Sequence, residues 1–415
     1  MSSIIQDANK IIRDSIDAVL PDAAVRRALA GREFNKPVKL IAIGKAAWRM
    51  AYVACKELGD QVDRGVIITK YDHSEGEIPR MEIYEAGHPV PDENGIQGTK
   101  RALELVCGLA EEDTVLLLVS GGGSALFELP LEGASLEDIA FLTRQLLACG
   151  ADITEINTLR KHLSAVKGGR FGAACAPAKV LCIVLSDVLG DSLDTIASGP
   201  AVPDQTSCED VTRLIAKYGL SVPDHLHALL SVETPKMLSG VETLITGNVT
   251  ALCRAAADSA QALGYTPLLM TTTLACEAKE AGAMASAIAR EIKTSGQPIK
   301  PPCAVILGGE TVVHLHGKGK GGRNQELALA AASGIDGLED VCIFSVGSDG
   351  TDGPTDAAGG IVTGEFVKKA CERGLSIEAT LAENDAYTML KEMDALLVTG
   401  PTGTNVNDVC VILCR

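Results

Sequence analysis

The sequence is poor in aromatic residues, in basic charge and in long apolar runs. Of its 415 residues only 3% are aromatic, and one is a tryptophan. Lys and Arg number 37 against 54 Asp and Glu, so the formal net charge is -17. Because such an acidic surface repels nucleic acid and anionic membranes, we expect neither as a partner. No apolar run reaches the roughly twenty residues of a membrane-spanning helix.

The thirteen cysteines lack the spacings that indicate a zinc ribbon or a redox-active pair, since no two of them form a C-x-x-C motif. Residues 1–10 lack the apolar segment of a secretion signal. The odd number of cysteines and the lack of such a signal favour reduced thiols. We therefore expect a cytoplasmic protein.

Hydrophobic residues make up 46% of the chain, and glycine is abundant at 42 residues. This composition is typical of layered α/β proteins. In the first half, short apolar runs alternate with helical stretches. The runs are residues 39–43, 65–69, 114–120 and 179–186, and the clearest helical stretches are residues 94–110 and 136–147. The runs are too uniformly apolar for half-exposed strands, so they predict a parallel sheet covered by helices on both faces.

A proline-containing polar stretch at residues 221–239 precedes a second series of this kind. Its expected strands are residues 244–246, 268–270, 303–307, 341–346 and 409–413, and its expected helices are residues 249–263, 278–293 and 326–332. Residues 311–316 alternate between apolar and polar, which predicts an antiparallel strand with one exposed face. We predict two Rossmann-like α/β domains with mostly parallel sheets and an interdomain cleft. The domains would comprise residues 1–237 and 238–415.

A glycine-rich segment after the third expected strand is the sharpest local motif. It runs through Ser120, Gly121, Gly122, Gly123 and Ser124. Consecutive glycines let backbone amides point into one concavity, which would bind a phosphate or carboxylate. A tight turn that only needs positive φ is the alternative. The segment lacks the Gly-Lys-Ser/Thr of a Walker A loop, and Leu126 stands where a nucleophile elbow needs glycine.

Basic residues form two further candidate anion sites. Lys45 follows the first expected strand, at the sheet edge where α/β proteins bind ligands. A second group lies in residues 157–170, where Asn157, Arg160 and Lys161 are candidates for phosphate binding. The alternative for Lys45 is a surface lysine in a turn. The alternative for residues 157–170 is a solvated helix face.

Carboxylates follow expected strands in both halves. Asp187, Asp191 and Asp194 come after the fourth run, and Asp349 lies in a glycine-rich loop after residues 341–346. Such carboxylates could bind Mg²⁺ or accept a proton from a hydroxyl, whereas plain Asp-Gly turns are the alternative. The spacing does not match an EF-hand.

A third set of candidates surrounds a Gly/Lys-rich loop. Glu310 follows residues 303–307, and the loop at residues 316–322 leads to Arg323 and Asn324 at an expected helix start. We interpret this arrangement as a mobile anion clamp, with a flexible hairpin as the alternative.

Seven motifs share one order along the whole chain. They are residues 45–47, 87–92, 120–126, 185–187 with 198–200, 308–311, 322–326 and 347–353. In this combination the chain resembles the class II glycerate kinases, whose C-terminal half is called the MOFRL domain.

The resemblance implies transfer of the γ-phosphoryl group of ATP to the 2-hydroxyl of D-glycerate, with Mg²⁺, in the cleft between two domains. Lys45 and Arg323 match the family's catalytic basic residues, and would contact the transferred phosphoryl group and the glycerate carboxylate. Asp187 and Asp349 are the candidates for Mg²⁺ ligand and catalytic base, with the division of roles open. The expected partners are small-molecule substrates, with a homo-oligomer possible.

Two alternatives remain: a hydroxypyruvate reductase, which is a label that family members have carried, and a non-catalytic glycerate or nucleotide sensor. We identify no dinucleotide-binding fingerprint, which requires G-x-G-x-x-G directly after a strand and an acid about twenty residues on. A sensor would normally bring an output domain, whereas two α/β units account for the whole chain.

Overall fold

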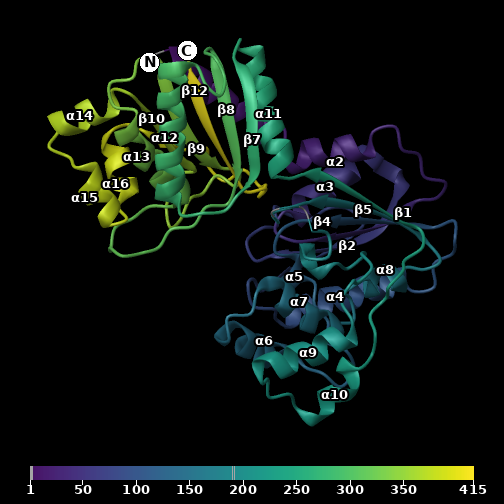
Figure 1. The fold of residues 1–415 in the computed structure, drawn as a ribbon. Helices are drawn as coiled ribbons and strands as arrows, with labels where there is room; N and C mark the ends of the chain where they lie inside the picture. The colour runs from purple at the N-terminus through teal and green to yellow at the C-terminus, as the bar shows by residue number, and fades with distance from the viewer. Residues whose placement is uncertain (1–2, 189, 191) are drawn as a thin grey trace. The chain divides into compact units, whose positions relative to one another are not determined.

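The computed structural model describes residues 3–188, 190 and 192–415. The chain packs as two compact units (Figure 1). The central unit comprises Ala24–Thr246, and the terminal unit combines Met1–Ala23 with Gly247–Arg415. This division differs from the expected boundary between residues 237 and 238. The N-terminal helix packs with the second half of the chain, and the strand at residues 241–247 belongs to the first sheet.

The central unit contains a six-stranded sheet in the order β3-β2-β1-β4-β5-β6 (Figure 1). Its strands are β1 (Val38–Ile43), β2 (Val62–Lys70), β3 (Met81–Ala86), β4 (Thr114–Val119), β5 (Lys179–Leu185) and β6 (Val241–Gly247). The pairings from β3 through β5 are parallel. This order is that of a Rossmann fold, so the predicted α/β architecture is confirmed.

Both faces of this sheet are buried because its strands are apolar throughout. Leu40 and Ala42 pack with α2 and α3, whereas Ile41 and Ile43 pack on the opposite face, which α4 and α8 cover. The helices and 3-10 turns are α2 (Pro21–Leu29), α3 (Ala47–Leu58), η1 (Gly59–Gln61), α4 (Glu93–Val106), α5 (Gly123–Leu126), α6 (Leu136–Ala148), α7 (Ile153–Leu163), α8 (Arg170–Ala174), η2 (Ile196–Ser198), α9 (Cys208–Tyr218) and α10 (Asp224–Leu230).

A separate helical layer extends the central unit. Helices α6, α7, α9 and α10 share a small apolar core of their own, built around Leu142, Leu159 and Leu226. In Figure 1 these helices lie together, away from the sheet. Several begin at well-formed caps; Ser135, Asp152 and Ser207 each form a capping box with the acidic residue three positions on.

The terminal unit contains a second sheet in the order β11-β10-β9-β12-β8-β7. Its strands are β7 (Thr266–Leu274), β8 (Cys303–Gly309), β9 (Val341–Gly347), β10 (Gly359–Thr363), β11 (Leu396–Leu397) and β12 (Asp408–Cys414). Only β7 and β8 pair in parallel; the other pairings are antiparallel. The expectation of parallel strands therefore describes the first sheet, whereas the second is mixed because β12 inserts between β8 and β9 in the opposite direction.

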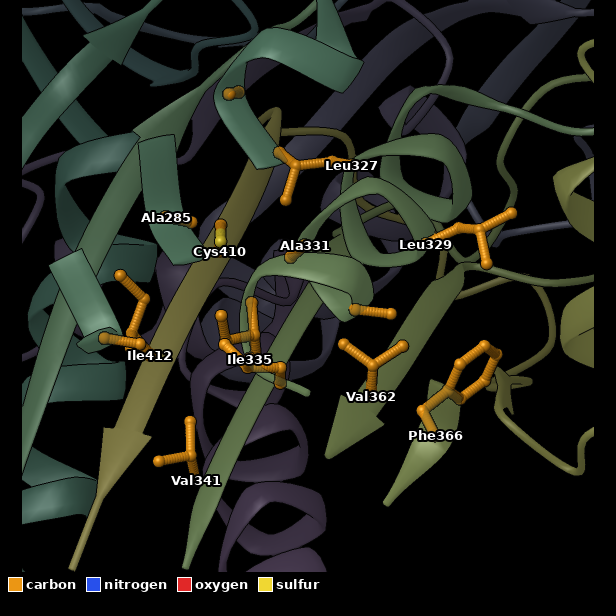
Figure 2. Packing of buried hydrophobic residues seen from close by; sticks show 14 of the residues in the cluster. Ala285, Leu327, Leu329, Ala331, Ile335, Val341, Val362, Phe366, Cys410 and Ile412 are labelled. Carbon is orange, nitrogen blue, oxygen red and sulfur yellow. The ribbon is translucent and has the colours of Figure 1, made fainter. Parts of the chain in front are cut away.

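Helices cover both faces of the second sheet. The helices are α1 (Ser3–Asp17), α11 (Val249–Ala262), α12 (Ala278–Ser295), α13 (Arg323–Gly334), α14 (Phe366–Glu372), α15 (Ile377–Ala382) and α16 (Ala386–Glu392). Helices α12 and α13 contact each other and form one core with the sheet, in which Leu327, Ile335 and Ile412 are buried (Figure 2). Helices α1 and α11 contact each other and also pack against this sheet.

The antiparallel strand predicted at residues 311–316 is wrong. Val312 forms only an isolated bridge to Glu277, and the side chains of Val312 and Leu315 are exposed. The physical reason is that β8, which precedes this segment, already pairs with β7 and β12 on its two edges. Within the described residues, no helix is both long enough and apolar enough to cross a membrane.

Candidate active site

The first sheet has a topological switch point between β1 and β4. From β1 the chain builds outward through β2 and β3, and it then returns to build β4, β5 and β6 on the other side. Loops that leave the carboxyl ends of such strands run in opposite directions and leave a crevice for a ligand. Lys45 follows β1 and the glycine-rich segment follows β4, so the structure places both predicted sites at this point.

Backbone contacts hold these two loops together. The Lys45 amide donates to the Gly121 carbonyl at 2.8 Å, and the Ala46 amide donates to Ser120 Oγ at 3.0 Å. Gly44 has φ of +112°, and a Cβ there would lie 2.3 Å from Ser120 Oγ. Ser120 is buried in these contacts. Its side chain therefore joins the two loops, and is not placed to contact a ligand.

Three ionisable side chains surround the glycines at the switch point. A Cβ on Gly121 would lie 2.2 Å from Asp187 Oδ2, so the carboxylate lies directly against this glycine. A Cβ on Gly122 would lie 3.0 Å from His88 Cδ2 and 3.2 Å from Lys45 Cγ. The structure thus brings Lys45 and Asp187 together, as two of the four predicted catalytic residues.

Burial determines the charge state of two of these groups. It raises the pKa of the Asp187 carboxyl, and the positive charge of Lys45 opposes that rise. Burial lowers the pKa of His88, and Lys45 acts in the same direction. The carboxylate is therefore a stronger proton acceptor than a solvated aspartate, and the imidazole is neutral near pH 7.

His88 is a site residue that the sequence pattern did not indicate. This histidine follows β3, an edge strand that the apolar pattern did not reveal because Glu82 and Glu85 interrupt it. Without β3, nothing located His88 at the carboxyl edge of the sheet. The available signal was its place in the motif at residues 87–92.

The predicted anion-binding residues of α7 support the glycine-rich segment from behind. Arg160 Nη2 donates to the Ser124 carbonyl at 3.2 Å, and Lys167 Nζ, from the turn that follows α7, donates to the same oxygen at 2.8 Å. Ser124 Oγ lies 3.1 Å from Ser198 Oγ, which donates to Asn157 Oδ1 at 3.1 Å. Asn157 and Arg160 therefore hold the position of the segment in this structure.

Strained backbone is found beside this support. Ala197 and Ser198 have φ of +51° and +58°, in the left-handed region that side chains other than glycine rarely adopt. A Cβ on Gly123 would lie 2.8 Å from the Ala197 Cβ. Such strain persists where the surroundings enforce it, commonly at functional sites.

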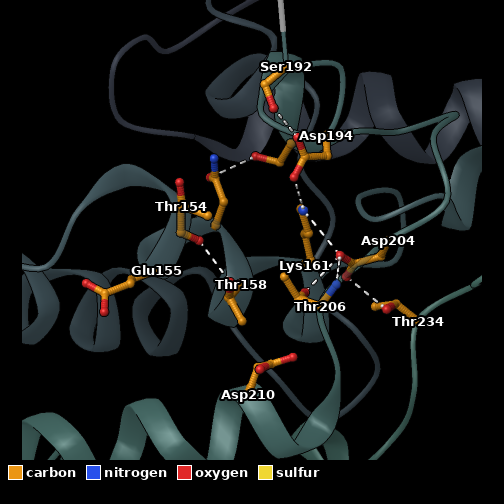
Figure 3. A network of polar contacts seen from close by, with 12 residues as sticks. Thr154, Glu155, Thr158, Lys161, Ser192, Asp194, Asp204, Thr206, Asp210 and Thr234 are labelled. Carbon is orange, nitrogen blue, oxygen red and sulfur yellow. Dashed lines mark hydrogen bonds and ion pairs between the residues drawn. The ribbon is translucent and has the colours of Figure 1, made fainter.

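Lys161 lies apart from the glycine-rich segment. It is buried, and its ammonium lies 3.4 Å from Asp194 Oδ2 and 3.2 Å from Asp204 Oδ1 (Figure 3). Asp204 also accepts hydrogen bonds from Thr206 and Thr234. Lys161 therefore forms ion pairs inside the protein in this structure. Asp191, the remaining acid predicted here, lies outside the described residues.

In the terminal unit, Arg323 is held by two carboxylates. Its Nε and Nη2 donate to Asp408 at 2.6 Å and 3.0 Å, and its Nη1 lies 3.0 Å from Glu310 Oε1. About a third of the Arg323 side chain, 31%, stays exposed. Burial raises the pKa of Asp408, and the Arg323 charge opposes this. The structure therefore brings together the predicted residues Arg323 and Glu310.

The first turn of α13 binds an internal carboxylate. Asp352 accepts hydrogen bonds from the Asn324 and Gln325 amides at 3.1 Å and 2.9 Å. Burial raises the pKa of Asp352 to about 6. Asn324 is buried and accepts from Ser345 Oγ at 2.6 Å. The helix start that we interpreted as an anion clamp is thus occupied by Asp352.

Asp349 lies in the loop after β9. Its Oδ1 accepts from the Thr351 amide at 3.0 Å, and its backbone carbonyl accepts from the Thr402 amide. The side chain is half-buried. Among the described residues, no hydrogen bond or ion pair joins its carboxylate to Arg323 or Glu310.

Residues 317–322 do match G-x-G-x-x-G letter by letter, although we identified no dinucleotide fingerprint in the sequence. The structure does not support a dinucleotide site there. No strand directly precedes these residues, and Asp352 occupies the amides of the helix that follows them.

Strand order and site geometry define the class of the protein, a doubly wound α/β protein whose switch point carries a lysine, a carboxylate and a glycine-rich turn. A family model described as a domain of unknown function, DUF4147, matches residues 7–231, and the MOFRL family model matches residues 303–408. The chain belongs to the family of glycerate kinases that combine these two domains.

Individual relatives agree with this assignment. The chain is 54% identical to the D-glycerate 2-kinase of Thermotoga maritima, over 97% of each chain. The crystal structure of glycerate kinase from the same organism superimposes with a TM-score of 0.97 at 53% identity, covering 100% of both chains. A putative hydroxypyruvate reductase of Agrobacterium vitis is 38% identical, over 98% of this chain and 94% of that protein.

Proposed function

We propose that the protein transfers the γ-phosphoryl group of ATP to the 2-hydroxyl of D-glycerate, giving 2-phosphoglycerate and ADP. The observation that carries this proposal is the convergence of Lys45 and Asp187 on the Gly121–Gly122 turn at the switch point. The names of relatives that match along almost the whole chain supply the substrate.

The side chains at the switch point suit phosphoryl transfer, which depends on positioning and charge neutralisation. The ammonium of Lys45 neutralises an anionic group of a substrate beside the glycine turn. Asp187 is the better placed base, because its raised pKa favours accepting the proton of the 2-hydroxyl. His88, neutral and in contact with the same turn, is a hydrogen-bond donor or acceptor for substrate oxygen.

The terminal unit carries a second candidate cation. About a third of the Arg323 side chain is exposed, and Asp408 fixes its orientation through two hydrogen bonds. A guanidinium held in this way is preorganised to receive a phosphate or carboxylate. We propose that Lys45 and Arg323 act on the same pair of substrates, with Glu310 and Asn324 holding the region around Arg323.

Mg²⁺ is the expected cofactor, and carboxylate oxygens are the ligands that it prefers. Asp187 and Asp349 are the two candidate residues; with Asp187 acting as the base, Asp349 would hold the ion, and its carboxylate oxygens fit this chemistry. When bound, Mg²⁺ neutralises charge on the phosphates of ATP. Activity should therefore vanish when EDTA removes divalent cations and should return when Mg²⁺ is restored.

The alternative function is that of a hydroxypyruvate reductase, which is the name given to the Agrobacterium vitis relative. The arrangement around residues 317–322 argues against a nicotinamide site of the Rossmann type. Two assays on the same purified protein separate the functions. The kinase proposal expects ADP formation that depends on D-glycerate, and no NADH oxidation with hydroxypyruvate. The reverse pattern would refute it.

We further propose a cytoplasmic location. All thirteen cysteines are free thiols, and six of them are at least partly accessible. Free, accessible thiols are typical of a reducing compartment.

A further inference from the structure

Three potential metal ligands meet in the helical layer of the central unit. They are His162 of α7, Cys208 at the first position of α9, and Glu233 in the segment after α10. One donor atom from each side chain lies within 4.8 Å of the other two. Three separate segments thus bring a nitrogen, a sulfur and an oxygen donor to one place, outside the candidate active site.

His162 has the tautomer that a metal ligand requires. Its Nδ1 lies 2.9 Å from the Thr158 carbonyl, and because a carbonyl only accepts, Nδ1 carries the proton. The lone pair is therefore on Nε2, which is buried without a hydrogen-bond partner. The whole side chain is 0% exposed, and burial lowers its pKa, so the imidazole is neutral. A histidine whose Nδ1–H donates to a carbonyl is the arrangement commonly seen in metal sites.

Cys208 and Glu233 supply the charge. The Cys208 amide donates to Glu233 Oε1 at 3.0 Å, so the carboxylate already lies against the first turn of α9. As a free thiol, Cys208 has a pKa that burial and the Glu233 carboxylate raise. A bound divalent cation would replace that proton. A thiolate and a carboxylate then balance the charge of the cation, and the start of α9 favours the thiolate.

Other charged groups face the cluster. Lys236 Nζ lies 2.8 Å from Glu233 Oε2, Arg170 interacts electrostatically with Cys208, and Asp204 interacts with His162. The carboxylate of Glu233 has lone pairs beyond those that Lys236 and the Cys208 amide use. The two cations reduce affinity for a metal, and Asp204 offsets part of that effect.

We propose that His162, Cys208 and Glu233 bind a zinc-type divalent cation, with solvent completing its coordination. Nitrogen, sulfur and oxygen donors from three side chains suit zinc in tetrahedral geometry, in which ligand atoms lie roughly 3.3–3.6 Å apart. The donor atoms already lie within 4.8 Å of one another, and rotation of the exposed Glu233 and partly exposed Cys208 side chains would bring them to this spacing.

A metal at this place would join α7 to α9 and to the segment after α10. Helix α7 also carries Asn157 and Arg160, which support the glycine-rich segment. The metal would therefore stabilise the layer on which that segment rests.

Cobalt titration of the full chain in excess Mg²⁺ tests the proposal. Mg²⁺ fills carboxylate sites, whereas Co²⁺ reports sulfur ligation through a thiolate charge-transfer band. The wild type should bind one Co²⁺ per chain with this band. Cys208→Ser should lose the band, and both Cys208→Ser and Glu233→Gln should bind at least about tenfold more weakly. Cys149→Ser changes an exposed cysteine of the same unit and should match the wild type.

Thermal unfolding provides a second measurement that does not depend on the spectrum. Zn²⁺ should raise the melting temperature of the wild type and of Cys149→Ser, and should leave that of Cys208→Ser unchanged. Because Cys208 and Glu233 lie at the surface of the layer, these variants are expected to fold without metal. A wild type that binds no Co²⁺, or variants of Cys208 and Glu233 that bind as the wild type does, would overturn the proposal.

Discussion

The glycine at position 121 offers a way to move Asp187 without changing it. An alanine Cβ there would lie 2.2 Å from Asp187 Oδ2, whereas ordinary contacts begin near 3.4 Å. The carboxylate must therefore move by about 1.2 Å. A misplacement of about 1 Å in a catalytic group costs on the order of a hundredfold in rate. We expect Gly121→Ala to lower kcat by about that factor.

The substitution should leave the fold intact, because the atom that must move is the end of a side chain and not backbone. ADP formation at saturating ATP and D-glycerate gives kcat, and circular dichroism checks the fold. Gly108→Ala is the control, since a Cβ there meets nothing within 4 Å although its φ of +73° makes the substitution strained. A folded Gly121→Ala protein with kcat within threefold of the control would show that Asp187 has no role at its observed position.

Three further predictions concern charged residues. The double variant Lys45→Ala/Arg323→Ala should lose little more kcat than the poorer single variant, because residues that act on one transition state give non-additive losses; fully multiplied losses would separate their roles. Burial raises the pKa of Asp352 from 3.8 to about 6, so the stability that this carboxyl contributes is greatest below pH 4 and is lost as the pH rises through 6. The unfolding free energy of Asp352→Asn minus that of the wild type, measured by urea titration, should therefore rise by on the order of 3 kcal/mol from pH 4 to pH 7. A difference that does not change with pH would contradict the shifted pKa. Lys161→Met leaves the carboxylate of Asp204 buried without its cation, so we expect a loss of about 3–5 kcal/mol in unfolding free energy; unchanged stability with a raised KM for ATP would instead support phosphate binding by Lys161.

The location of the site at a sheet edge could be predicted because it follows from local patterns. Uniformly apolar runs before Lys45 and before the glycine-rich segment identify parallel strands, and the carboxyl ends of such strands lie at one edge. The arrangement of the second sheet could not be predicted in this way. Strand β12 comes from the end of the chain and pairs with β8 and β9, and such long-range pairing leaves no trace in local periodicity.

The roles of individual basic residues also could not be predicted from the sequence. Arg160 and Lys161 are adjacent and equally charged, yet one supports the Ser124 carbonyl and the other is buried with Asp194 and Asp204. Charge alone does not distinguish a cation that faces a ligand from one that faces an internal partner. The contact partners decide this, and they come from segments far away in the chain.

Product analysis by phosphorus NMR determines directly whether the protein phosphorylates the 2-hydroxyl of D-glycerate. Purified protein is mixed with D-glycerate, ATP and Mg²⁺, and the phosphoglycerate formed is compared with authentic 2- and 3-phosphoglycerate. We expect the resonances of 2-phosphoglycerate and ADP, appearing in equal amounts and only when D-glycerate is present. Phosphorylation at the 3-hydroxyl, or no phosphoglycerate from a folded protein, would contradict it.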